Sequence, residues 1–235
     1  MSTPIDTRVS SALHEGNVAN VDGYSEETAP LLASTMEAFS DAYITIGKIF
    51  DARAAASANK AWTESQQVIH VADAAFKAQQ RLLKKFDGLT ATLGKQITHL
   101  EQELSTPLES KAVVSIAAEI RKHTKHMAGD QRHQFLRHAI DEGDATTVSA
   151  ILGAPSYLSG LDAKFAKTYT RLWHERMNPA TATRLKAVRN AKALVDERVG
   201  LIITQIEKAI GAPWSRINMV RQGNDKALAA LKFGE

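Results

Sequence analysis

The feature that most restricts the fold is a regular seam of apolar residues in the middle of the chain. From Leu82 to Leu104 the apolar residues recur at steps of 4, 3, 4, 4, 3 and 4, which makes two successive eleven-residue units. An eleven-residue repeat corresponds to about 3.67 residues per turn, close to the period of a straight α-helix. With the apolar positions from Val71 onward, the spacing predicts one nearly straight helix of about forty residues. Gly88 and Gly94 are the positions where it could be interrupted.

The composition agrees with a helical chain. Among 235 residues there are only 13 Gly and 6 Pro, and 44% of the residues are hydrophobic but only 6% aromatic. Such a chain can bury a core and contains few residues that break helices. No segment has the alternating pattern of a strand. We therefore predict an all-α fold, an elongated multi-helix bundle.

The chain is expected to have three parts. Residues 1–28 are polar and lack a sustained apolar period, so they are interpreted as a polar N-terminal arm. Residues 29–105 are predicted to form a long helical hairpin, whose second helix opens with a capping box at Thr63 and Gln66. Residues 106–235 are predicted to form a helical bundle that ends in a C-terminal amphipathic helix.

Two local patterns organise the third part. In "STPLES" Thr106 can cap a helix, Pro107 can occupy its first position and Glu109 can close a capping box. The helix that this pattern predicts has four apolar residues expected to point inward, namely Val113, Ile116, Ala117 and Ile120. "AIDEGDATTVSAILGAP" predicts a short helix-turn-helix segment, in which Gly143 ends one helix and Asp144 caps the next.

Several classes of protein are not expected. The chain has no cysteine, which removes disulfides, thiolate zinc sites and iron–sulfur clusters. No apolar run approaches the roughly 20 residues of a membrane span, and the first twenty residues lack the pattern of a secretion signal. Glycine-rich phosphate loops, nucleophile elbows and metalloprotease helices are absent. We expect neither enzymatic activity nor a cofactor.

The charge is distributed unevenly along the chain. The net charge is +3, but residues 1–41 carry −6 and residues 164–192 carry +7. Such separation predicts complementary contacts. Either the acidic region docks on a neighbouring subunit or partner, with 164–192 as its receptor, or the two regions meet within one folded chain.

The stretch "RKHTKHMAGDQRHQFLRH" (121–138) holds four of the eight histidines. Glu119, His123 and His126 share one helical face and could hold a metal, but the basic residues around them disfavour a cation, so no metal site is predicted. The same basic residues could bind an anion, contact a partner or form a solvated face. The candidate anion or partner contacts in this stretch and in 164–192 are Arg121, Lys122, Lys125, Arg132, Arg137, Lys164, Lys167, Arg171, Arg184, Lys186, Arg189 and Lys192.

A resemblance suggests a biological setting. The segment "HAIDEGDATTVSAILGAPSYLSGLD" (138–162), followed by "LWHERMNPATATRLKAVRNAKALV", resembles helical proteins encoded in the structural gene clusters of tailed bacteriophages; the similarity covers residues 138–195. The resemblance implies a phage protein made in the host cytoplasm and working in or near the virion.

Two functions are expected from these features. The first is a non-enzymatic structural or assembly protein of the virion that forms a homo-oligomer and binds other virion proteins. The alternative is a nucleic-acid-associated helical protein that contacts DNA weakly through the basic regions 121–138 and 164–192.

Overall fold

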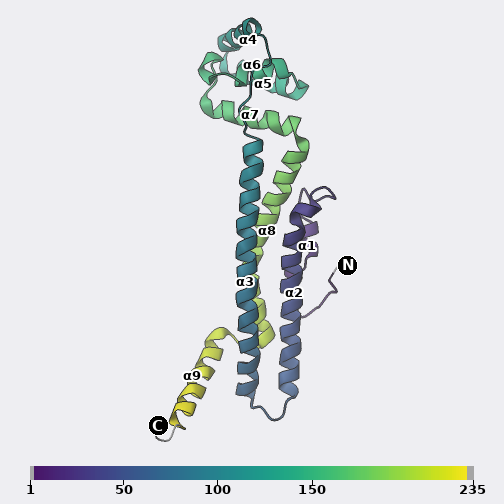
Figure 1. Cartoon of the computed structure of the whole chain (residues 1–235), viewed down its shortest axis with the longest axis vertical. Coiled ribbons are helices and arrows are strands. Elements are labelled where there is room, and N and C mark those ends of the chain that lie inside the picture. The colour runs from purple at the N-terminus through teal and green to yellow at the C-terminus, as the bar shows by residue number, and fades with distance from the viewer. Residues whose placement is uncertain (1–2, 232–235) are drawn as a thin grey trace. The chain divides into compact units, whose positions relative to one another are not determined.

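The protein is described by a computed structural model, which covers residues 3–231 (Figure 1). It is 78% helical, and no strand occurs among these residues, which confirms the all-α prediction. The elements in chain order are η1 (Ser11–Leu13), α1 (Gly16–Ala19), α2 (Ala29–Ala58), α3 (Glu64–Glu103), α4 (Val114–His126), α5 (Gly129–Glu142), α6 (Ala145–Leu152), η2 (Ser156–Leu158), α7 (Ala163–Met177), α8 (Pro179–Ile210) and α9 (Trp214–Ala230). None of the helices within 3–231 combines the length and the hydropathy needed to cross a bilayer.

The helices belong to two compact units. Unit 2 consists of residues 95–186, and unit 1 takes in the described residues before and after that segment. The expected division at residue 105 therefore differs from the one in the structure. Residues from 187 onward pack in unit 1 with the N-terminal half of the chain, because the apolar stripe of α8 continues beyond unit 2. α3 and α8 each contribute to both units.

The long seam helix is confirmed as α3, forty residues without interruption at either glycine. Its predicted capping box is present: the Thr63 amide donates to Gln66 Oε1 at 2.9 Å, and the Gln66 amide donates to Thr63 Oγ1 at 3.3 Å. Each helical glycine costs about 1 kcal/mol relative to alanine. Burial of the seam outweighs that cost; its buried members are Val71, Ala75, Leu82, Phe86, Leu89, Leu93, Leu100 and Leu104.

In unit 1, α2 packs against α3. The rings of Phe39 and Phe86, both fully buried, lie 5.5 Å apart between centroids. α9 begins beside α3, where the Trp214 indole donates to Gln79 Oε1 at 3.0 Å. Trp214 therefore helps to attach α9 to α3.

The N-terminal segment corrects one expectation. Residues 3–28 do not form a free polar arm, because they fold onto α2 and α8 within unit 1. Leu13 and Val18 are fully buried, and the Tyr43 hydroxyl donates to the Asp6 carbonyl and accepts from the Asp6 amide, both at 2.8 Å. The Ser10 amide donates to a side-chain oxygen on α8 at 3.1 Å. The few apolar residues of this N-terminal segment follow no helical period, but Leu13 and Val18 are nevertheless buried within unit 1.

In unit 2, the expected helix start at Thr106 is wrong. α4 begins at Val114, and the Thr106 hydroxyl instead donates to carbonyls in the last turn of α3. The Lys111 amide donates to Ser149 Oγ at 3.0 Å. The Lys111 amide thus bonds to a side chain of α6, whereas the capping pattern at Thr106 would have placed that amide inside a helix.

The helix-turn-helix prediction is confirmed. α5 ends at Gly143, whose φ of 73° is left-handed, and Asp144 Oδ1 accepts from the Thr147 amide at 3.0 Å as the cap of α6. Trp173 of α7 is buried in the core that this segment forms. The buried members of this core are Leu136, Ala139, Ile140, Val148, Ile151, Leu161 and Trp173.

The expected inward face of α4 is partly wrong. Val113 and Ile116 are 67% and 52% exposed, whereas Ala117 is buried and Ile120 packs partly against the core. α4 lies against α6, with the face that repeats at residues 117, 120 and 124. Ile116 is about 100° from Ala117 and about 80° from Thr124 around the helix, so it lies at the edge of that face and its side chain stays exposed.

Candidate functional site

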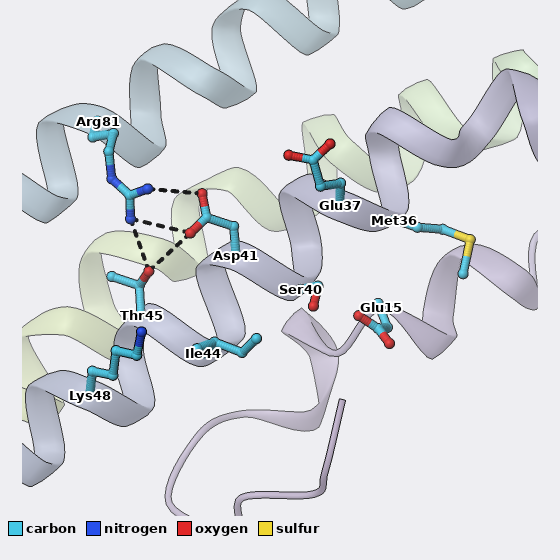
Figure 2. A pocket seen from close by; sticks show the side chains of 9 residues that line it. All are labelled: Glu15, Met36, Glu37, Ser40, Asp41, Ile44, Thr45, Lys48 and Arg81. Carbon is cyan, nitrogen blue, oxygen red and sulfur yellow. Dashed lines mark hydrogen bonds and ion pairs between the residues drawn. The ribbon is translucent and has the colours of Figure 1, made fainter. Parts of the chain in front are cut away.

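A hollow of unit 1 that several charged and polar side chains line lies beside α2 (Figure 2). It has a volume of about 690 Å³, and it is lined by Glu15, Met36, Glu37, Ser40, Asp41, Ile44, Thr45, Lys48 and Arg81. Figure 2 shows Arg81 reaching from α3 toward Asp41 and Thr45; its nitrogens lie 3.2 Å from both Asp41 oxygens and 3.0 Å from Thr45 Oγ1. These contacts hold α2 to α3 across the hollow.

The carboxylate of Glu15 belongs to this hollow and is 8% exposed. Its two oxygens accept from the Thr3 amide and the Thr3 hydroxyl, each at 2.8 Å. Burial alone would raise the pKa of Glu15, but hydrogen bonds from Ser40 and Thr3 outweigh burial and lower that pKa. A carboxylate stabilised in its charged form is a poor general base.

Ser40 belongs to the same hydrogen-bond network as Glu15 and Thr3. Its hydroxyl lies 2.7 Å from Thr3 Oγ1. The nearby imidazole of His14 accepts from the Gly16 amide through Nδ1 and contacts the Thr3 carbonyl through Nε2, each at 3.0 Å. Both ring nitrogens are therefore occupied by the backbone, and the hollow is a structural polar network.

The acidic residues of α2 are paired within unit 1. Lys85 Nζ lies 2.8 Å from Glu37 Oε1 and 3.3 Å from Asp41 Oδ2. For Glu37 and Asp41 the partner is thus α3, and not the basic region 164–192 that the charge pattern suggested. Charge complementarity is satisfied here between neighbouring helices of one unit.

Asp41 should make unit 1 sensitive to acid. Burial alone would raise the pKa of Asp41, but the hydrogen bond from Lys85 and the charges of Arg81 and Lys85 outweigh it, so the pKa lies below its usual value. A lowered folded-state pKa stabilises the protein above the unfolded pKa of about 3.9, and this stabilisation is lost as the pH falls through the folded value. Asp41→Asn is expected to lower the free energy of unfolding at pH 7 by up to about 1 kcal/mol.

Urea unfolding at neutral pH and near pH 3 measures this effect, with Asp87→Asn on the exposed side of α3 as the control. The deficit of Asp41→Asn should be present at neutral pH and shrink toward zero in acid. An equal deficit at both pH values would contradict the assigned role of the ion pairs.

Among the predicted contact residues in unit 2, two arginines are structural. Arg132 donates to the carbonyls of Thr124 at 3.1 Å, Lys125 at 3.2 Å, Met127 at 2.9 Å and also Gly160. Arg121 donates to the carbonyl of Ala150 in α6 at 3.1 Å. Both guanidinium groups therefore satisfy backbone carbonyls between elements of unit 2.

The remaining predicted contact residues differ in whether they form ion pairs and in how exposed they are. Arg171 and Lys192 form ion pairs with residues four positions later, at 2.7 Å to Glu175 and 2.6 Å to Asp196. Arg189 is half-buried. The exposed candidates are Lys122, Lys125, Arg137, Lys164, Lys167, Arg184 and Lys186.

The structure also places an aromatic cluster that the sequence interpretation missed. The ring of His133 on α5 lies 4.5 Å from the Phe165 ring and 5.7 Å from the Tyr169 ring on α7. The spacing of Phe165 and Tyr169, one helical turn apart beside two lysines, was the available signal. Their partner His133 comes from another helix, which the sequence alone does not identify.

The possible metal ligands are not gathered. His126 Nδ1 lies 2.6 Å from the Lys122 carbonyl, and the His123 ring packs edge-on against Phe135 at 5.8 Å. Within residues 3–231 no group of three or more His, Asp or Glu side chains is arranged to hold a metal ion. Glu119, His123 and His126 therefore form no recognisable metal site.

A second surface of unit 2 is apolar. Val113, Val114 and Ile116 at the start of α4 are 67%, 82% and 52% exposed. Tyr157 and Leu158 of η2 are exposed as well, and η2 lies against α4. Large apolar side chains are therefore exposed on two elements that contact each other.

Comparisons with protein family models, with curated proteins and with solved structures gave no match in any of the three.

Proposed function

We propose that this chain is a non-enzymatic structural or assembly protein that oligomerises and binds other proteins of a tailed-bacteriophage particle. The observation that carries this proposal is the apolar surface of α4 and η2, which we call the α4 patch and which consists of Val113, Val114, Ile116, Tyr157 and Leu158. Protein association buries such surfaces, and contiguous exposed apolar residues mark interaction sites.

The energetics favour association through the α4 patch. Removing apolar surface from water contributes about 25 cal/mol per Å², so covering five large side chains offsets part of the entropy lost on binding. Val113 and Val114 also lie at the N-terminal end of a helix, a rigid element that requires little ordering on binding. The patch is therefore a better contact than a flexible segment of the same composition.

Two further observations support the proposal. The polar side chains that line the hollow of unit 1 hold the N-terminal segment to α2 and hold α2 to α3. The resemblance of residues 138–195 to phage structural proteins supplies the setting and covers α6 and η2, which contact α4. Both observations agree with a protein that acts by binding other proteins of the particle.

Charge insertion into the α4 patch is expected to abolish association. The double variant Val114→Asp and Ile116→Asp should lower self-association, or retention on purified virions of the encoding phage, by at least about tenfold, because two carboxylates would be buried without partners. Met219→Asp on α9 is the matched control, since Met219 is 66% exposed in unit 1. It should behave like the native chain.

Light scattering coupled to size-exclusion chromatography measures the oligomer, and mass spectrometry of purified particles measures retention. A native chain that stays monomeric and is absent from particles would refute the proposed function. Equal losses of association in the double variant and in Met219→Asp would show that the contact lies outside the α4 patch.

A further inference from the structure

Unit 2 carries an aromatic ring that is both held in place and open to a ligand. Phe165 contacts the ring of His133, which in turn stacks on Tyr169 at an angle of 28°. The Tyr169 hydroxyl lies 3.0 Å from His133 Nδ1, which fixes the histidine between the two rings. Phe165 nevertheless remains 48% exposed. A supported ring with an open surface suits stacking against a planar group.

Arg132 links the end of α4 to the loop that precedes α7, so that the two basic regions of the sequence meet in unit 2. Its guanidinium donates to the Lys125 carbonyl near the end of α4 and to the Gly160 carbonyl, which lies shortly before α7. Gly160 has a left-handed φ of 72°, and a Cβ there would meet the guanidinium carbon at 2.9 Å, so a side chain does not fit. The exposed lysines on the last two turns of α4 and the first two turns of α7 are Lys122, Lys125, Lys164 and Lys167.

Unit 2 contributes the positive net charge of the protein. Residues 95–186 contain 13 Lys and Arg against 10 Asp and Glu, together with six of the eight histidines. The rest of the sequence contains 16 of each sign. Asp162, the acidic residue next to the α7 lysines, accepts from the Lys164 amide at 2.7 Å as a helix cap. The excess of positive charge in unit 2 favours the approach of a polyanion to that unit.

We propose that Phe165, together with the exposed lysines of α4 and α7 in the same unit, forms a binding surface for single-stranded nucleic acid. An unpaired base stacks on the Phe165 ring, and backbone phosphates contact the lysines of α4 and α7. A duplex covers the faces of its bases and cannot use the ring, which is why the single strand is the expected ligand. The inference does not rest on the proposed assembly role, because it uses none of the residues of the α4 patch.

Binding of the full chain to a fluorescein-labelled oligo-dT of about 20 nucleotides, followed by anisotropy at low salt, tests the proposal. Stacking of one base contributes about 1–3 kcal/mol, so Phe165→Leu is expected to weaken binding at least about fivefold. Phe165→Tyr keeps the ring and should bind like the native chain. This pair of variants separates base stacking from general apolar contact.

The lysines are tested by charge reversal. The double variant Lys164→Glu and Lys167→Glu should weaken binding, and the slope of log affinity against log salt should become shallower by about 1.4, since each phosphate that is no longer neutralised reduces the slope by about 0.7. Lys84→Glu on α3 makes the same type of substitution on the exposed side of unit 1 and is expected to leave the slope unchanged. Circular dichroism confirms that each variant is folded.

Four results would overturn the proposal. They are absence of oligo-dT binding at low salt, equal affinity for a duplex of the same length, unchanged binding by Phe165→Leu, and equally tight binding of polyglutamate. The last result would identify the surface as a contact for an acidic protein.

Discussion

Phe86→Ala is expected to lower the free energy of unfolding of unit 1 by about 3–5 kcal/mol. Phe86 is fully buried on the seam of α3 and packs against the ring of Phe39 on α2. Truncation to alanine loses the burial of the ring and leaves a cavity, because two long helices joined at several points cannot close completely around it. A domain is stable by only about 5–15 kcal/mol, so much of the stability would be lost.

Urea unfolding followed by circular dichroism measures this change. Phe165→Ala removes the same ring from a half-exposed position and is the matched control, with an expected loss below about 1 kcal/mol. Similar losses at the two positions would show that the α2–α3 seam does not form the core of unit 1.

Arg132→Met is expected to destabilise unit 2 by about 3 kcal/mol. A hydrogen bond from a charged donor contributes about 1.5–3 kcal/mol, but water reaches part of this side chain and its four bonds share one guanidinium, so their contributions do not add. Without Arg132 the last turn of α4 and the loop at Gly160 lose a common donor. Arg132→Lys keeps the charge but not the planar fork and should recover only part of the stability.

Hydrogen exchange resolved by peptide is the suitable measurement, because it reports on unit 2 separately from unit 1. Amides of α4, α5 and α7 should exchange faster in Arg132→Met, whereas those of α2 should not. Arg137→Met, on the exposed side of α5, serves as the control and should leave exchange unchanged. Unaltered protection of α4 in Arg132→Met would contradict the assigned role of the guanidinium.

Arg132 also links stability to the surface proposed to bind nucleic acid. The sequence interpretation grouped Arg132 with the cations available to an anion, yet its donors are directed at backbone carbonyls. Its effect on a ligand would be indirect, through the positions of α4 and α7. The exposed lysines and Phe165 are the residues that remain available for contact.

Features that depend on residues close together in the chain could be predicted from the sequence. The seam from Val71 to Leu104 is periodic over many turns, so α3 was predictable although two glycines lie within it. The capping box at Thr63 and the Gly143–Asp144 turn were predictable for the same reason, since their hydrogen bonds join residues within about five positions. Local contacts leave a pattern in the chain that physical rules can recognise.

Features that depend on residues far apart in the chain could not be predicted in this way, because long-range packing sets them. The amide of Lys111 bonds to Ser149, which displaced the helix start expected at Thr106. The buried places of Leu13 and Val18 are provided by packing within unit 1, so a segment without a period of its own is nevertheless folded. The contact of His133 with Phe165 joins residues on two helices. In each case the stabilising contact is made with a residue far along the chain. A single sequence does not indicate which residue that is.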